Sequence, residues 1–243
     1  MKNKIYLLLA LCLFSCNSET PQVNHIKPGK EKKVEDINLT LNNPVQLDSS
    51  NFVMYPLVLT TDEYKTDDSY GKSSGRTSTY WNIIFYNTAN GESHLLDENR
   101  KMVIYQYQQN SESSGQNNIN HTTNKLIFYT VKTLDHNQNG ILDYKDPDYL
   151  FTSDNEGKNF KQISPPGATV NDWQLIEKTN KILMMVAFDT NKDKKFNEDD
   201  TVTPMIYDLN TNTVSKEIFD TKFTSKIKNL LDKNWLKKPK NND

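Results

Sequence analysis

Short apolar runs, each bounded by polar residues, dominate the hydrophobic pattern of this 243-residue chain. The runs are rich in Ile, Val, Phe and Tyr, and Asn, Asp, Gly or Ser stand at their ends, a pattern typical of β-strands. The predicted strands span residues 52–59, 80–86, 102–107, 125–134, 149–152, 173–176, 182–188 and 205–209. The body of the chain is therefore expected to be all-β.

Two tight turns predict local hairpins within this body. Asn90-Gly91 separates residues 83–86 from 94–96, and Asn155-Glu156-Gly157 separates residues 149–152 from 160–163. Each turn contains the Gly that a tight hairpin connection favours. Neighbouring strands are thus expected to pair antiparallel.

The chain also repeats a larger unit, because Asp135 and Asp189, 54 residues apart, begin matching acidic loops. Each of these two copies runs strand, acidic loop, strand, turn, strand, and the strands at 102–107 and 173–176 are expected to head them. A weaker first copy has its incoming strand at 52–59, a long loop at 62–79 and a hairpin at 80–96, without the acidic pattern. The sequence therefore predicts about three strand-loop-strand repeats, of which the two later ones are four-stranded antiparallel sheets.

The second copy resembles a known repeat. Its hairpin, YLFTSDNEG at 149–157 followed by KQIS at 161–164, resembles the WD40-like repeats of periplasmic TolB-type β-propellers. The resemblance implies propeller-like blades. Closed propellers usually have about four to eight blades, so closure, an open stack and oligomerisation all stay open, with a plain β-sandwich as the simpler alternative.

The last segment has helical instead of strand periodicity. Phe223, Ile227, Leu230 and Leu231 recur at three- and four-residue spacing before a lysine-rich tail. This predicts a short C-terminal helix within residues 223–243. Because so short an apolar stripe usually belongs to a core, the helix is expected to cap the β-domain, with partner binding as the alternative.

The first acidic loop, residues 135–146, has the spacing of an EF-hand calcium loop. A hard cation takes six to eight oxygen ligands, and a tight loop directs alternate side chains toward one centre. Gly140 occupies position 6, where the loop turns sharply. The predicted ligands, at positions 1, 3, 5, 7, 9 and 12, are Asp135, Asn137, Asn139, the Ile141 carbonyl, Asp143 and Asp146.

The second acidic loop, residues 189–200, repeats the pattern. Its predicted ligands are Asp189, Asn191, Asp193, the Lys195 carbonyl, Asn197 and Asp200. Lys194 replaces the turn glycine and is expected to need a positive φ, which costs about 1 kcal/mol or more. The second site is therefore expected to be the weaker or more strained one.

Both loops depart from the EF-hand in ending on Asp instead of Glu, which resembles dockerin-type calcium loops. Pro147 opposes an exiting helix, so a strand-loop-strand site is predicted. Position 8 is expected to point inward, at Leu142 and Phe196, whereas His136 at position 2 is expected at the surface. Ordinary Asn- and Asp-rich turns are the alternative, but two matching loops favour a metal, and oxygen ligands favour calcium over zinc.

The first residues predict secretion and lipidation. A basic start precedes an apolar run at 5–14 that is too short to span a bilayer, which is the pattern of a cleaved signal peptide. The ending LFSC at 13–16 resembles the lipobox of bacterial lipoproteins, which implies a lipid on Cys16. The expected organisation is a signal peptide at 1–16, a flexible tether at 17–36, a β-rich repeat domain at 37–222, and a helix with a basic tail at 223–243.

Charge and cysteine content narrow the function further. Loss of Lys2 and Lys4 with the signal changes the net charge from -2 to -4, so nucleic-acid binding is not expected. Cys12 would leave as well, and Cys16 would carry lipid, so the mature chain has no internal disulfide. Its stability is then expected to come from the core and from bound metal.

No catalytic motif is apparent, so an enzyme is not expected. The loops 62–79, 135–147 and 189–201 are expected to emerge at one end and form a joint surface. The predicted function is a membrane-tethered envelope lipoprotein that acts as a binding or scaffold module for protein or glycan. The alternative is an extracytoplasmic hydrolase with an unrecognised carboxylate site. Asn17 after Cys16 favours the outer membrane over inner-membrane retention.

Overall fold

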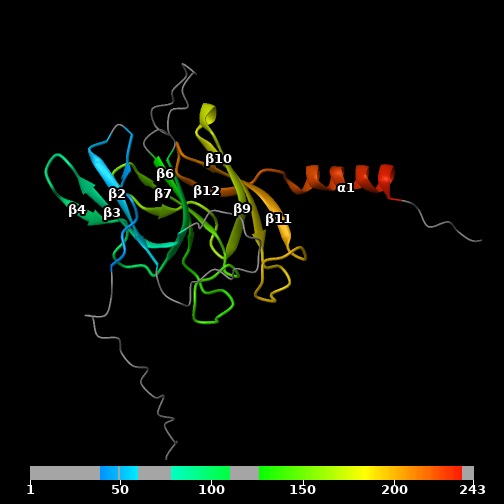
Figure 1. The fold of residues 1–243 in the computed structure, drawn as a ribbon. Helices are drawn as coiled ribbons and strands as arrows, with labels where there is room; N and C mark the ends of the chain where they lie inside the picture. The colour runs from blue at the N-terminus through cyan, green and yellow to red at the C-terminus, as the bar shows by residue number, and fades with distance from the viewer. Residues whose placement is uncertain (1–38, 49, 60–77, 110–125, 237–243) are drawn as a thin grey trace, which may run out of the picture. The chain divides into compact units, whose positions relative to one another are not determined.

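Antiparallel strands build nearly all of the regular structure in the computed structural model, which describes residues 39–48, 50–59, 78–109 and 126–236 (Figure 1). The strands are β1 (Val45–Gln46), β2 (Phe52–Val58), β3 (Tyr80–Asn87), β4 (Ser93–Leu95), β5 (Val103–Gln109), β6 (Leu126–Lys132), β7 (Tyr149–Asp154), β8 (Lys161–Gln162), β9 (Ala168–Ile176), β10 (Lys181–Phe188), β11 (Thr201–Asp208) and β12 (Thr213–Glu217). The described helices are a 3-10 turn at Glu177–Thr179 and α1 (Thr221–Trp235).

The strands form two sheets. One has eight strands in the order β1-β2-β3-β5-β6-β7-β8, with β4 also paired to β3, and the other has the order β12-β11-β10-β9. The Val170 N–H of β9 donates to the Asp148 carbonyl (2.8 Å), just before β7, and so links the two sheets. The expectation of an all-β antiparallel fold with a C-terminal helix is confirmed.

Three successive groups of four strands can be followed in this topology: β1–β4, β5–β8 and β9–β12. The first two groups join in one sheet through a single β3–β5 pair, Tyr80 with Ile104. The third group is a four-stranded meander of its own. The described strands do not close into a ring.

Strand β9 is longer than the sequence pattern indicated, since it begins at Ala168 instead of residue 173. Its early part carries the polar pair Asn171 and Asp172, which interrupts the apolar run and is exposed. Pairing with β10 continues across this interruption through a register shift next to Met185. Tertiary pairing therefore extends a strand that local hydrophobicity does not mark.

The core consists of two clusters, and the central strands supply both. Ile127, Tyr129 and Val131 of β6 belong to the larger cluster with β2, β3 and β5. Phe128, between them, belongs to the smaller cluster, where Ile182 and other residues of the second sheet pack. Successive side chains of a strand point to opposite faces, so β6 buries both of its faces.

The turn between β7 and β8 packs onto the first group of strands. Gly157 has φ +80°, and a Cβ atom there would overlap the fully buried Phe85 ring. His94 Nε2 of β4 lies 2.9 Å from the carbonyl oxygen of Glu156 in the same turn. The predicted hairpin turn at 155–157 is present, and it also serves as a tertiary contact.

Helix α1 does not cap the β-domain as expected. Asp220 caps its first turn, where Oδ1 accepts a hydrogen bond from the Phe223 N–H (2.7 Å), and the helix runs to Trp235. None of its residues is buried. In Figure 1, α1 (red) lies beside the sheets and not between them. The helical periodicity was read correctly, but periodicity cannot distinguish a buried stripe from an open one.

Candidate metal loops

The first acidic loop follows β6 and is organised around the side chain of Asp135. The backbone N–H groups of Asn139 and Gly140 donate to its two carboxylate oxygens, at 3.0 and 2.8 Å. Asn137 Oδ1 accepts from the Asn139 N–H (2.9 Å), and Asn139 Oδ1 accepts from the Ile141 N–H (3.0 Å). The side chains at positions 1, 3 and 5 are thus held in place by N–H groups of the loop's own backbone.

Asp146 closes the same loop. Its Oδ1 accepts the His136 N–H (2.9 Å), its Oδ2 accepts the Asp143 N–H (2.9 Å), and only 3% of Asp146 is exposed. Asp143 Oδ1 in turn accepts the Lys145 N–H (2.8 Å). Positions 1 and 12 therefore hold the beginning and the end of the loop together.

The second loop, between β10 and β11, has the same pattern at its start. The N–H groups of Asp193 and Lys194 donate to the two oxygens of Asp189, both at 3.1 Å. Asn191 Oδ1 accepts the Asp193 N–H (3.0 Å), and Asp193 Oδ1 accepts the Lys195 N–H (2.9 Å). Each of these bonds has its counterpart 54 residues earlier.

The close of the second loop matches as well. The buried Asp200 accepts the Thr190 N–H at Oδ1 (2.9 Å) and the Asn197 N–H at Oδ2 (3.1 Å). Asn197 Oδ1 accepts the Asp199 N–H (2.8 Å). The two sequence repeats therefore adopt one loop conformation.

The backbone angles agree with these hydrogen bonds. Gln138 and Gly140, at positions 4 and 6 of the first loop, have φ +61° and +90°. Lys192 and Lys194, at the same positions of the second loop, both have φ +63°. The positive φ expected at Lys194 is confirmed, and a non-glycine side chain there carries about 1 kcal/mol of strain.

The position-8 anchors differ between the loops. Leu142 is buried, as expected, whereas Phe196 is only half-buried and its ring lies 4.8 Å from the ring of His136. The first loop is thus anchored by a buried Leu142, whereas Phe196 of the second loop packs partly against His136 of the first.

The two loops contact each other, and His136 makes the main contact. Its Nε2 donates to Asp189 Oδ2 (2.9 Å), and 19% of its side chain is exposed, so the histidine expected at the surface is half-buried against the second loop. The hydrogen bond from His136 lowers the pKa of Asp189, and the N–H groups of Lys194 and Lys192 act in the same direction. Lys194 Nζ also donates to Gln138 Oε1 (2.8 Å).

A buried lysine, Lys132, contacts the end of the first acidic loop. Lys132 Nζ donates to the Asp146 carbonyl (2.6 Å) and pairs with Asp148 Oδ1 (2.8 Å), and 3% of its side chain is exposed. Sequence reasoning missed this residue, although a lysine at the end of an apolar strand is a signal that an acidic partner lies nearby. The first loop is therefore held by a charge pair as well as by its own turns.

Replacing this buried cation should destabilise the protein. We expect Lys132→Met to lower the free energy of unfolding by about 2 kcal/mol, because Asp148 loses its partner and the Asp146 carbonyl loses a donor. Denaturation by urea measures the change. Lys181→Met is the matched control, since Lys181 is 41% exposed and 3.9 Å from Asp208, and it should cost less than about 0.5 kcal/mol. Equal losses in both variants would contradict the assigned role.

A separate pocket lies away from the loops, near the start of β6. Its volume is about 250 Å³, and its lining is Gln108, Phe128, Trp173, Gln174, Leu175 and Glu177. Small-molecule sites usually measure about 300–1,000 Å³, so this hollow is small for a substrate pocket. It does not favour the hydrolase alternative.

The predicted ligands differ in how far the structure brings them together. The side chains at positions 1, 3, 5, 9 and 12 gather within each loop through the hydrogen bonds above. Within the described residues, however, no three His, Cys, Asp or Glu side chains form a group that could hold a metal. Carboxylates alone thus make no site, and the asparagine side chains with the carbonyls of Ile141 and Lys195 would have to complete a six- to eight-oxygen shell.

Other predicted features fall outside the described residues. These are the lipidation site Cys16, the signal and tether segments, and most of the non-acidic loop predicted at 62–79. In the described part of the chain, no helix has both the length and the apolar character needed to cross a membrane.

No protein-family model matches this chain, and no curated protein sequence matches it.

Proposed function

We propose that this chain is a lipid-anchored envelope protein whose two acidic loops bind calcium and thereby hold a surface that binds a protein or glycan partner. The observation that carries the proposal is that the two loops have the same hydrogen bonds and the same backbone conformation. The same positions accept the same backbone N–H groups in both, although the loops are 54 residues apart. Chance polar turns would not repeat the residue types at positions 1, 3, 5, 9 and 12 together with the positive φ angles at positions 4 and 6.

The chemistry of the donors fits calcium. Most of the side-chain oxygens accept one N–H and keep a second lone pair for a cation, as in known oxygen-ligand loops. Asp189 Oδ2 differs, because it accepts from both the Lys194 N–H and His136 Nε2. Each loop also carries several carboxylates, such as Asp135, Asp143 and Asp146, whose negative charge a cation would balance. The ion would supply charge balance and a fixed centre, and the residues of the loop would supply its shape.

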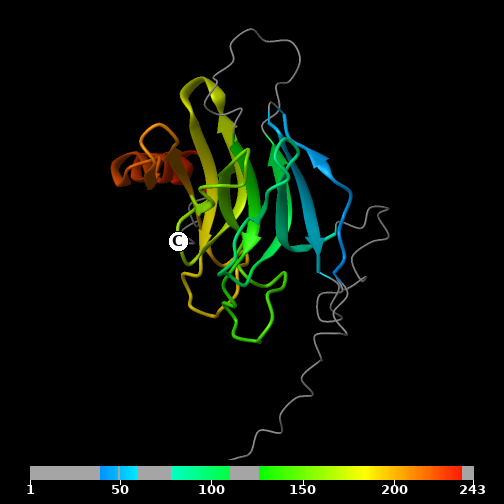
Figure 2. The same cartoon turned by 90° about the vertical axis from the view of Figure 1, so that its left-hand side faces the viewer.

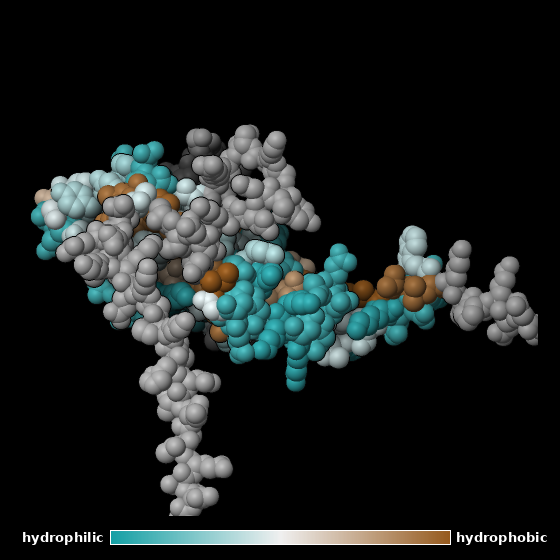
Figure 3. Space-filling model, turned by 60° about the horizontal axis from the view of Figure 1, so that its bottom comes forward, coloured by the Kyte–Doolittle hydropathy of each residue, from teal (hydrophilic) through white to brown (hydrophobic). Residues whose placement is uncertain are grey.

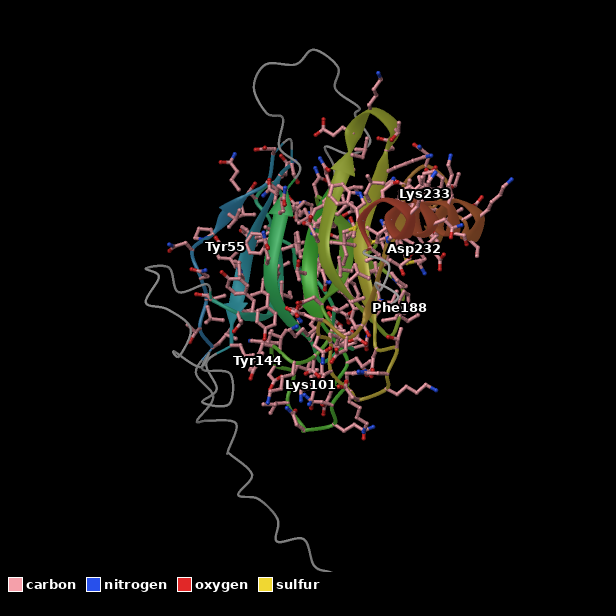
Figure 4. All side chains as sticks on the ribbon, turned by 90° about the vertical axis from the view of Figure 1, so that its right-hand side faces the viewer. Tyr55, Lys101, Tyr144, Phe188, Asp232 and Lys233 are labelled. Atoms are coloured by element: carbon pink, nitrogen blue, oxygen red, sulfur yellow. The ribbon has the colours of Figure 1, made fainter. Side chains whose placement is uncertain are left out.

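The loop end is the surface that we assign to a partner. Both loops emerge at the same end of the sheets (Figure 2), and His136 joins them there. Tyr144, in the first loop, is 73% exposed and lies at this end in Figure 4. Figure 3 shows a mainly hydrophilic surface on this side, which suits a polar protein or glycan partner more than an apolar ligand.

Lipid anchoring is proposed from the sequence. The support is the signal-like start, the resemblance of residues 13–16 to a lipobox, and the absence of any other cysteine after Cys16. Such a chain would be retained at the cell envelope, and we favour the outer membrane. Its role would be that of a binding or scaffold module and not an enzyme.

Calorimetric titration tests the calcium proposal. Calcium added to metal-stripped protein that begins at Asn17 should give two binding events, with dissociation constants on the order of 10⁻⁴ to 10⁻³ M, as in extracellular modules. Asp135→Ala should remove the event of the first loop, and Asp189→Ala that of the second. The second loop should bind more weakly, because Lys194 occupies the strained position.

An acidic turn outside the loops provides the control. Asp97 accepts the Asn99 and Arg100 N–H groups (2.8 and 3.1 Å) but has no calcium spacing around it. Asp97→Ala should therefore leave both binding events intact. Absence of any calcium-dependent heat in the unmodified chain would reduce both loops to polar turns.

A further inference from the structure

Helix α1 exposes an ordered apolar stripe. Phe223, Ile227, Leu230, Leu231 and Trp235 follow one another at helical spacing, and each is about half exposed or more, with Trp235 at 79%. Figure 3 shows brown residues of α1 next to teal ones on the same helix. No described part of the chain covers this stripe, since none of the residues of α1 is buried. Burial of such side chains against another surface would be favourable.

The charge on this segment is opposite to that of the whole chain. Between Thr221 and Asp243 the sequence contains seven lysines and two aspartates, while the chain as a whole has a net charge of -2. At 100° per residue, Lys222, Lys226 and Lys233 border one side of the apolar stripe. Lys228 borders the other side. Ser225, Asn229 and Asp232 lie opposite the stripe, and Thr224 and Asn234 are polar positions within it. Asp232 and Lys233 are labelled on the helix in Figure 4.

We propose that α1 docks onto an anionic lipid surface. The helix would lie in the plane of the interface, with its apolar stripe in the acyl boundary and its bordering lysines extended to the headgroup phosphates. Lysines on the flanks of an apolar face, with a tryptophan at the end, are the arrangement that such interfacial helices use. The proposal goes beyond calcium binding and does not depend on it.

The same stripe fits a second copy of the chain less well. A coiled coil would place Phe223, Ile227, Leu230 and Asn234 on its seam, so one of four seam positions would be polar. The flanking positions would carry Lys226 and Lys233, with no acidic residue opposite them to pair in either chain. Fifteen residues provide only about two heptads, and coiled coils generally need more. The charges therefore favour a negatively charged surface over another basic helix.

Vesicle co-sedimentation tests this proposal. The probe is the chain from Asn17 onward, which retains the compact unit 39–243 and lacks the apolar start that would bind lipid by itself. A chelator keeps calcium from bridging acidic loops to lipid. Binding to phosphatidylcholine vesicles containing phosphatidylglycerol should exceed binding to pure phosphatidylcholine by at least about tenfold, and it should fall as salt is added.

Variants separate the stripe from the charges. Ile227→Glu with Leu230→Glu should lower binding at least about tenfold, and Lys222→Gln with Lys226→Gln and Lys233→Gln should abolish the preference for anionic lipid. Ser225→Gln with Asn229→Gln, on the opposite face, should change neither. Circular dichroism checks that each variant is folded.

Three results would overturn the proposal. One is equal binding to neutral and anionic vesicles, and another is unchanged binding after both glutamate substitutions. The third is self-association in sedimentation velocity that the glutamate substitutions abolish, without any vesicle binding, which would assign the stripe to a second copy.

Discussion

Saturating calcium is expected to raise the free energy of unfolding of the metal-stripped protein by about 5 kcal/mol. A ligand at about 100 times its dissociation constant stabilises a folded state by about 2.7 kcal/mol per site, and this chain has two proposed sites. For a domain of this size each kcal/mol corresponds to a melting temperature change of about 2–4 °C, so the total rise should be about 10–20 °C. Differential scanning calorimetry with and without calcium measures it.

We expect the calcium-dependent rise in the free energy of unfolding to divide between the two loops. Asp146 and Asp200 are both buried at the close of their loops, so the unbound state holds carboxylates in positions of reduced solvation. Asp135→Ala and Asp189→Ala should each remove about half of the calcium-dependent gain. A similar rise produced by magnesium, or by sodium chloride at equal ionic strength, would show that general charge screening and not a calcium site is responsible.

Gly157→Ala is expected to lower the free energy of unfolding by about 3 kcal/mol. The positive φ of Gly157 costs an alanine about 1 kcal/mol, and overlap of its Cβ with the Phe85 ring adds about 2 kcal/mol more. The Phe85 ring cannot move away from the added Cβ without disturbing its neighbours, because Phe85 is fully buried in the larger core cluster. Urea denaturation of the two proteins gives the difference.

Gly167 separates the two contributions to this loss. It also has a positive φ (+71°), but nothing lies within 4 Å of its added Cβ, so Gly167→Ala should cost only about 1 kcal/mol. In addition, Phe85→Leu should reduce the cost of Gly157→Ala, since a smaller side chain leaves room for the methyl group. If the two glycine variants were equally destabilised, the packing of the β7–β8 turn against β3 would be refuted.

Local features of the fold could be predicted from the sequence. The run 80–86 became β3, Tyr80–Asn87, and Gly157 marked a hairpin turn, because both depend on residues close together in the chain. The repeat placed a loop between β6 and β7 and another between β10 and β11. The positive φ at Lys194 followed from loop spacing alone.

Contacts between distant residues could not be predicted in the same way. His136 and Asp189 are 53 positions apart, and neither residue carries a mark that the other will lie 2.9 Å away. Lys132 ends a strand whose pattern predicts burial, but the pattern does not identify Asp148 as the group that neutralises it. For α1, the apolar stripe predicts a helix equally well whether or not another surface covers it.

The charge pair next to the first acidic loop has no counterpart at the second. Counting from the ends of each acidic loop, Lys132 and Asp148 beside the first loop correspond to Val186 and Val202 beside the second. The two loops share one conformation, although the first is flanked by the ion pair of the buried Lys132 and the equivalent positions of the second are the buried Val186 and the 42% exposed Val202. Placing a valine at only one of these positions in this chain would leave Lys132 or Asp148 without its partner, at a cost in stability. The shared loop conformation therefore does not require a charge pair at these two positions.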